Sequence, residues 1–153
     1  MSETFKTLTA DRGSVTAMTS VDDTPVPALN ALSIVTRDMG AALGFYRLCG
    51  LTFPEGAENQ PHADTTAGGL RIMFDTRDVV SSFTPDWTEP SGGHRMAVAF
   101  ECASPAQVDA LHRRLVDAGH SSAHEPFDAF WGQRYAVVRD PDGNPVDFYC
   151  PIK

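Results

Sequence analysis

One pattern occurs twice in this sequence and limits the folds that the chain can adopt. In its first copy, residues 31–36 (ALSIVT) form a short run rich in β-branched residues, which is typical of a strand. Asp38 follows as a helix N-cap, and apolar residues then recur at helical spacing up to Gly50, a residue suited to ending a helix. This half of the chain therefore begins with a strand and a capped helix.

The second copy repeats this plan with clearer signals. A strand is expected over 95–101, and Ser104 follows as the N-cap of a second helix. Pro105 stands at the first helical position, Gln107 completes a capping box, and Gly119 ends the helix. The repeat predicts two modules of about 60 residues each.

The end of the chain carries a strong hairpin signal. Strands are expected over 134–139 and 145–149, and they are joined by residues 140–144 (DPDGN). In such a turn proline fixes φ, aspartate side chains accept bonds from nearby amides, and glycine takes the left-handed conformation.

These elements predict an α+β fold of two βαβββ modules, over about 28–85 and 93–151. Neither module can bury both faces of its sheet alone, so helices should cover one face of a curved mixed sheet and leave a concave ligand groove on the other. The domain should span 28–153. Residues 1–27 are polar and aperiodic, and they are expected to form a tail.

Charge and composition exclude several classes of partner. The 153 residues carry a net charge of −8 and only two lysines, which disfavours nucleic acid and favours a neutral or cationic small molecule. No apolar window is long enough to cross a membrane, and no signal core is present, so a cytoplasmic protein is expected. The three separated cysteines, Cys49, Cys102 and Cys150, are expected to be reduced and core-like.

Three segments carry a family resemblance. Residues 38–47 (DMGAALGFYR), 131–135 (WGQRY) and 140–144 (DPDGN) resemble the vicinal oxygen chelate superfamily, which includes glyoxalase I, extradiol dioxygenases and bleomycin resistance proteins. The resemblance covers about 28–151. It does not extend to residues 1–27.

A narrower set of segments is similar to the resistance proteins of that superfamily that bind mitomycin or sequester anthraquinone-fused enediynes. These segments are Pro61-His62, 68–71 (GGLR), Asp75-Thr76, 92–95 (GGHR) and 131–135. The similarity implies a non-catalytic homodimer that binds a planar antibiotic and confers self-resistance. Whether the modules pair within one chain or across two is left open.

The resemblance also allows a metal site to be tested. Enzymes of the superfamily hold a divalent ion with four side chains, and the matching positions here are Ala31, Met73, Ala97 and Asp147. One carboxylate among four positions does not suit a divalent ion, so no metal and no cofactor are expected. No histidine pair has metal-binding spacing. His112, His120 and His124 are expected to be solvated.

The similarity to the drug-binding proteins implies that Trp131 and His62 stack on opposite sides of a planar ligand, with Trp87 as a further wall. The alternatives are that Trp131 fills its own core, that His62 is an ordinary loop histidine, and that Trp87 packs a loop.

Strand alternation extends this site. If Asp147 faces the groove, as its family position implies, then every second residue does so on the same strand. The residues between them, Val146 and Phe148, then face the core. The same alternation in the strand before the first module's end places Ile72 and Phe74 in the core. The groove residues would be Met73, Asp75, Ala99, Glu101, Asp147 and Tyr149.

Two other functions remain open. One is a metal-free enzyme that modifies a quinone-like ligand in the same groove. The other is a metal-dependent lyase or dioxygenase whose ligands lie at positions other than those aligned above.

Overall fold

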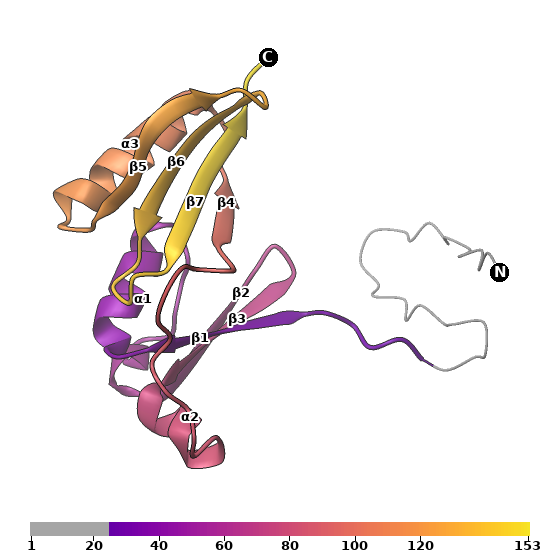
Figure 1. Ribbon diagram of the computed structural model, residues 1–153, viewed down its shortest axis with the longest axis vertical. Helices are drawn as coiled ribbons and strands as arrows, with labels where there is room; N and C mark the ends of the chain where they lie inside the picture. Colours follow the sequence, from indigo (N-terminus) through magenta and orange to yellow (C-terminus); the bar gives the residue numbers. More distant parts are fainter. Residues whose placement is uncertain (1–24) are drawn as a thin grey trace. The chain divides into compact units, whose positions relative to one another are not determined.

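The computed structural model describes residues 25–153, so the tail expected over 1–27 lies almost wholly outside the described residues. The elements within residues 31–153 are shown in Figure 1. They are β1 (Ala31–Thr36), α1 (Met39–Leu48), the 3-10 helix η1 (Ala57–Asn59), β2 (His62–Ala67), β3 (Leu70–Thr76), α2 (Arg77–Phe83), β4 (Val98–Glu101), α3 (Pro105–Asp117), β5 (Ser122–Ala129), β6 (Gln133–Arg139) and β7 (Pro145–Pro151). No helix in this part of the chain is both long and apolar enough to cross a membrane.

The strands form two mixed sheets, which confirms the α+β fold with two βαβββ-like modules. The first sheet has the order β1-β3-β2 and the second β4-β7-β6-β5. In each sheet the first strand of the module pairs in parallel with the last, and the remaining pairs are antiparallel. The first module has two strands after its helix and the second has three.

Helices cover one face of each sheet. Helix α1 packs against β3, and α3 packs against β5, β6 and β7. The side chains that face these helices are buried and include those expected in the core, Ile72, Phe74, Val146 and Phe148. The two helices also contact each other, so the buried side chains of both modules form one core.

Both helices begin where the sequence predicts. The Asp38 carboxylate accepts a hydrogen bond from the Ala41 N–H. Ser104 Oγ accepts one from the Gln107 N–H, and Gln107 Oε1 accepts one from the Ala103 N–H at 2.6 Å. The capping box is therefore present, with the return bond made one residue before the cap.

The DPDGN turn forms the expected hairpin and also joins the two modules. Asp140 Oδ1 accepts hydrogen bonds from the backbone N–H groups of Asp142 and Asn144, and Gly143 has a φ of 87°. Asp140 is buried, and its Oδ2 accepts a 2.9 Å bond from the hydroxyl of Tyr46 in α1. This contact links the second module's hairpin to the first module's helix.

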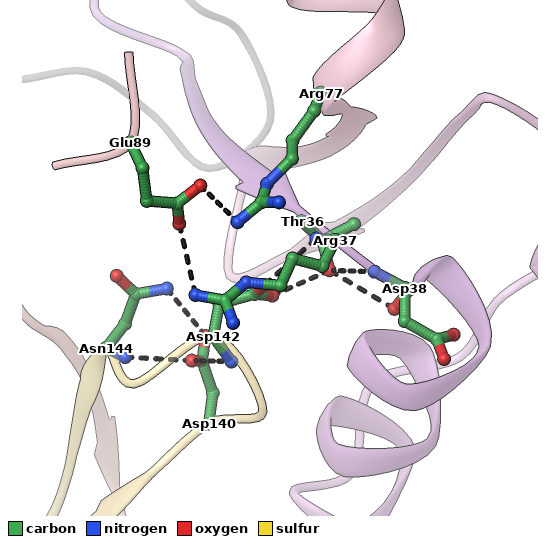
Figure 2. Close-up of polar contacts among 8 residues, drawn as sticks. All are labelled: Thr36, Arg37, Asp38, Arg77, Glu89, Asp140, Asp142 and Asn144. Atoms are coloured by element: carbon green, nitrogen blue, oxygen red, sulfur yellow. Dashed lines mark hydrogen bonds and ion pairs between the residues drawn. The ribbon is translucent and has the colours of Figure 1, made fainter.

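Asp142 makes a second link to the first module. Its carboxylate accepts hydrogen bonds from Thr36 Oγ1 at 2.6 Å and from the Arg37 N–H at 2.9 Å, at the end of β1 (Figure 2). Thr36 is almost fully buried. The turn is thus bonded to both the first strand and the first helix.

Three features of the sequence reading are corrected by the structure. The strand expected over 95–101 begins only at Val98, because the opposing β7 begins with Pro145, which has no N–H to donate. Strand β2 and helix α2 were not predicted. Thr76 caps α2 by accepting a hydrogen bond from the Val79 N–H.

His112 is a further correction, because it is buried rather than solvated. Its Nε2 lies 2.7 Å from Ser122 Oγ, and its burial lowers the pKa of the imidazole. The cysteines were expected in the core, and two of the three are buried there. Cys102 and Cys150 are buried, and burial raises the pKa of the half-buried Cys49 thiol to about 12.

Replacing Tyr46 with Phe is expected to destabilise the protein by about 1.5–3 kcal/mol, because the buried Asp140 carboxylate loses a hydrogen-bond donor. Urea unfolding followed by circular dichroism measures this change. Tyr149→Phe, on the uncovered face of the second sheet, is the matched control. Equal stability of Tyr46→Phe and the wild type would show that the Tyr46–Asp140 bond does not help to hold the modules together.

Candidate functional site

Eight of the nine predicted site residues lie on the sheet faces that the helices leave uncovered. We call these the first open face, on β1-β3-β2, and the second open face, on β4-β7-β6-β5. The first carries His62, Met73 and Asp75. The second carries Ala99, Glu101, Asp147 and Tyr149, with Trp131 in the turn between β5 and β6. Trp87 lies apart, between α2 and β4.

The first open face has a histidine held by a carboxylate. His62 lies opposite Asp75 in the β2–β3 pair, and its Nδ1 is 2.7 Å from Asp75 Oδ1. Ser33 Oγ donates to the other oxygen of Asp75 at 3.1 Å. The side chain of Asp75 is 14% exposed and that of His62 is 42% exposed. The contact with Asp75 occupies Nδ1, so Nε2, the outer nitrogen of His62, is the one left for other contacts.

A second carboxylate on this face is already paired. Asp64 accepts a hydrogen bond from Arg71 Nε at 2.7 Å, and this bond lowers the pKa of Asp64. Asp64 also lies 3.8 Å from His62 Nε2. The first open face is therefore polar, with one ring on it.

The second open face carries a row of aromatic rings. The ring of Trp131 lies 5.5 Å from that of Tyr135 and 6.1 Å from that of Phe127, centroid to centroid, in edge-to-face contacts. Tyr135 in turn stacks on Tyr149 at 6.4 Å. Trp131 is half-exposed, and its Nε1–H donates to Gln133 Oε1 at 2.8 Å. We call Phe127, Trp131, Tyr135 and Tyr149 the aromatic row.

Asp147 orients one member of this row. The Tyr135 hydroxyl donates to Asp147 Oδ2 at 2.6 Å. Burial and the adjacent carboxylate together raise the pKa of Tyr135. Ala99 is the strand neighbour of Asp147, and its small side chain leaves the carboxylate accessible beside the rings. The face thus combines flat apolar surfaces with a hydrogen-bond acceptor.

The structure does not bring the two proposed stacking residues onto one face. His62 belongs to the first sheet and Trp131 to the turn of the second, so each sits on its own open face. Tyr135 was not among the predicted site residues. Its place on the open face depends on its pairing with Tyr149, which alternation within one strand does not reveal.

Trp87 lines a cavity of about 290 Å³ between the modules, and it is the only one of the nine predicted residues to do so. The cavity lies between β1, the beginning of β4 and the segment that connects α2 to β4. Sequence reasoning missed this cavity, because it depends on how the two sheets meet.

The residues at the superfamily's metal positions do not fit a divalent ion. Ala31 and Ala97 have no donor, Met73 offers only a thioether, and the Asp147 carboxylate accepts the Tyr135 hydroxyl. Within residues 25–153, no group of three or more His, Cys, Asp or Glu side chains is placed to hold a metal ion.

Comparison with known proteins identifies one family. Residues 28–148 match the family model described as Glyoxalase/Bleomycin resistance protein/Dioxygenase superfamily. No curated protein matches the chain.

Several solved structures share the fold. A glyoxalase/bleomycin resistance protein/dioxygenase family enzyme from Burkholderia phytofirmans PsJN has a TM-score of 0.73 at 20% identity, over 82% of this chain and 100% of that one. A family member from Nocardioides has a TM-score of 0.66 at 24% identity, over 84% and 85% of the two chains. A lactoylglutathione lyase from Agrobacterium tumefaciens has a TM-score of 0.59 at 21% identity, over 83% and 96%.

Replacing Asp147 with Asn is expected to let Tyr135 ionise at lower pH, because the carboxylate that opposes the phenolate is removed while the burial remains. The phenolate absorbance band, followed during an alkaline titration, reports this shift. Asp64→Asn removes a carboxylate from the first open face instead and should leave the titration as in the wild type. An unchanged curve for Asp147→Asn would contradict the pairing.

Proposed function

This chain belongs to the Glyoxalase/Bleomycin resistance protein/Dioxygenase superfamily, and we propose that it is a non-catalytic member that sequesters a planar cytotoxic antibiotic. The ligand would be of the mitomycin or anthraquinone-fused enediyne type, and binding it would confer self-resistance. The single observation that carries the proposal is the aromatic row on the second open face.

The geometry of the aromatic row supports stacking on a flat ligand. Trp131 is half-exposed, and the adjacent Phe130 is 97% exposed, so both of these neighbouring rings meet water. Exposed apolar surface of this kind is unfavourable unless a partner covers it. The bond from Trp131 to Gln133 and the edge contact with Tyr135 hold the indole in one orientation. A ring held in this way can stack on a planar ligand with little loss of conformational freedom.

The first open face would supply the opposite wall. The His62 ring is fixed by Asp75, so it can lie against a flat ligand and offer its outer nitrogen as a hydrogen-bonding group. Met73 stands beside it in β3 as an adaptable apolar contact. The two walls differ in character, since one is aromatic and the other mainly polar.

Because the two walls lie on different sheets, we propose a homodimer in which the first open face of each copy meets the second open face of its partner. A two-fold axis then builds two identical grooves from two chains. This arrangement covers both open faces at once.

The charges of both walls favour a ligand with amine or hydroxyl groups. Asp75 lies on the first open face, and Glu101 and Asp147 lie on the second. Carboxylates accept hydrogen bonds and attract cations, and the net charge of −8 acts in the same direction.

A second candidate function rests on the His62–Asp75 pair. A histidine oriented by a carboxylate is the usual arrangement of a general base, so a metal-free enzyme acting on a quinone-like ligand is the alternative. Incubating a quinone ligand with a small amount of protein separates the two functions. Product in molar excess over protein supports the enzyme, and recovery of the ligand at its original mass supports sequestration.

Trp131→Ala is expected to weaken binding of mitomycin C by about 1–3 kcal/mol, the usual effect of removing a central aromatic anchor. Isothermal titration calorimetry measures the change without relying on tryptophan emission. Phe83→Ala is the matched control, since Phe83 is an exposed ring on α2 away from both open faces. If both variants bind like the wild type, the aromatic row is not the ligand wall.

Mixing two defective variants tests whether the groove is shared between chains. His62→Ala and Trp131→Ala damage opposite walls, so each homodimer has two defective grooves. After subunit exchange at equal amounts, half of the dimers are mixed and each has one intact groove, which restores tight binding at about one quarter of all grooves. If each groove is built within one chain, mixing restores none.

A further inference from the structure

We propose that the cavity between the modules is a second ligand site, distinct from the aromatic row and from the His62–Asp75 pair, that takes a small uncharged molecule of one or two rings bearing an N–H or O–H group. This site goes beyond the proposed function, because its walls and its ligand are different.

The cavity is bounded by two sheet edges and a covering segment. Strands β1 and β4 are each at the edge of their sheet, and both line it. Residues 87–97 contribute most of the remaining wall, and the DPDGN turn contributes the floor through Asp142 and Asn144. The space of about 290 Å³ lies at the lower end of the usual size range of small-molecule pockets, which suits a ligand of one or two rings.

Most of the wall is apolar, which favours a ring-shaped guest. The indole of Trp87 provides a flat surface, and other apolar side chains come from β1, β4, the segment and the first residue of β7. They include Leu32, Val35, Pro90, Met96, Val98 and Pro145. Displacing water from such surfaces supplies the main driving force for binding.

A few polar groups face the same space and explain the need for a hydrogen-bond donor. Asn144 uses its Nδ2–H to bond Asp140 Oδ2 at 2.9 Å, so its carbonyl oxygen points the other way, as Figure 2 shows. His94 also lines the cavity. The free edge of β1 adds further backbone acceptors, alternating with N–H groups, because β1 has no second strand partner in its sheet.

The charged groups at the cavity already have partners, which favours an uncharged ligand. Glu89 and Arg77 line the cavity and pair with each other, and Glu89 also pairs with Arg37 at 3.3 Å, outside the lining (Figure 2). Asp142 accepts hydrogen bonds from Thr36 Oγ1 and the backbone N–H of Arg37. A charged ligand would lose hydration without gaining an unpaired partner.

The same ion pairs hold the covering segment in place. Glu89 stands in the segment, Arg37 follows β1 and Arg77 begins α2, so Glu89 ties the cover to two elements of the first module. All three side chains are more than a third exposed, so these bonds are weak enough to open for ligand entry.

The chain has two tryptophans, and they report on the two sites separately. In Trp131→Phe the only tryptophan is Trp87 at the cavity, and in Trp87→Phe it is Trp131 on the second open face. The probe is 4-nitrobenzyl alcohol, an uncharged single ring that quenches tryptophan emission and carries an O–H. Saturable quenching is expected in Trp131→Phe, with a dissociation constant roughly between 10 µM and 1 mM, a range set by so small a ligand. Trp87→Phe should show only linear, collisional quenching.

A variant whose new side chain fills the cavity provides the second test. Ala97→Phe, made in the Trp131→Phe background, should abolish saturation because Ala97 lines the cavity. Ala110→Phe in the same background adds the same bulk on the exposed surface of α3 and should keep it. 4-Nitrobenzoate, the anionic analogue, should bind at least tenfold more weakly.

Saturable quenching that persists in Ala97→Phe, or linear quenching in Trp131→Phe, would overturn the proposal. Either result leaves antibiotic binding on the open faces untouched, because mitomycin C binding is measured separately on the wild type and on Trp131→Ala.

Discussion

The arrangement of this molecule depends on two carboxylates in one turn. Asp140 and Asp142 belong to the hairpin of the second module, yet they accept hydrogen bonds from Tyr46, Thr36 and the Arg37 backbone of the first. Burying a carboxylate is unfavourable unless donors surround it, and Asp140 has three backbone or side-chain donors besides Tyr46. The turn therefore satisfies its own backbone and fixes the second module on the first. Both the cavity and the positions of the two open faces follow from this junction.

Joining the modules through their helices and this turn leaves one face of each sheet uncovered. Helix α1 contacts α3, and the apolar side chains of both modules point into a common core. The side chains on the opposite faces then have no covering layer within the described chain. On the second sheet these include Trp131 and Tyr149, which are large rings. An antiparallel sheet normally presents polar residues on its solvent side, so the aromatic row is a departure that calls for an occupant.

Local signals in the sequence were enough to predict much of the fold. Ser104 and Asp38 mark helix starts because a side-chain oxygen must satisfy free N–H groups there, and alternation in β3 and β7 separates core from open face correctly. Strand β2 (HADTTA) was missed because a polar edge strand has little hydrophobic pattern. The burial of His112 and the cavity at Trp87 depend on contacts between elements distant in sequence. The separation of His62 and Trp131 onto two sheets could not be predicted either, because it also depends on contacts between elements distant in sequence.

Two of the four positions that the superfamily resemblance assigns to a metal have other physical roles here. Ala97 lines the cavity, where a larger donor side chain would occupy space. Asp147 keeps its carboxylate, but the Tyr135 hydroxyl bonds to it at 2.6 Å, so the group now orients a ring. A carboxylate engaged in this way is less available to a cation, and it gains a structural function within the aromatic row. Under the proposed function, Asp147 thus serves to shape a surface for a flat molecule, a role that needs no donor at the other three positions.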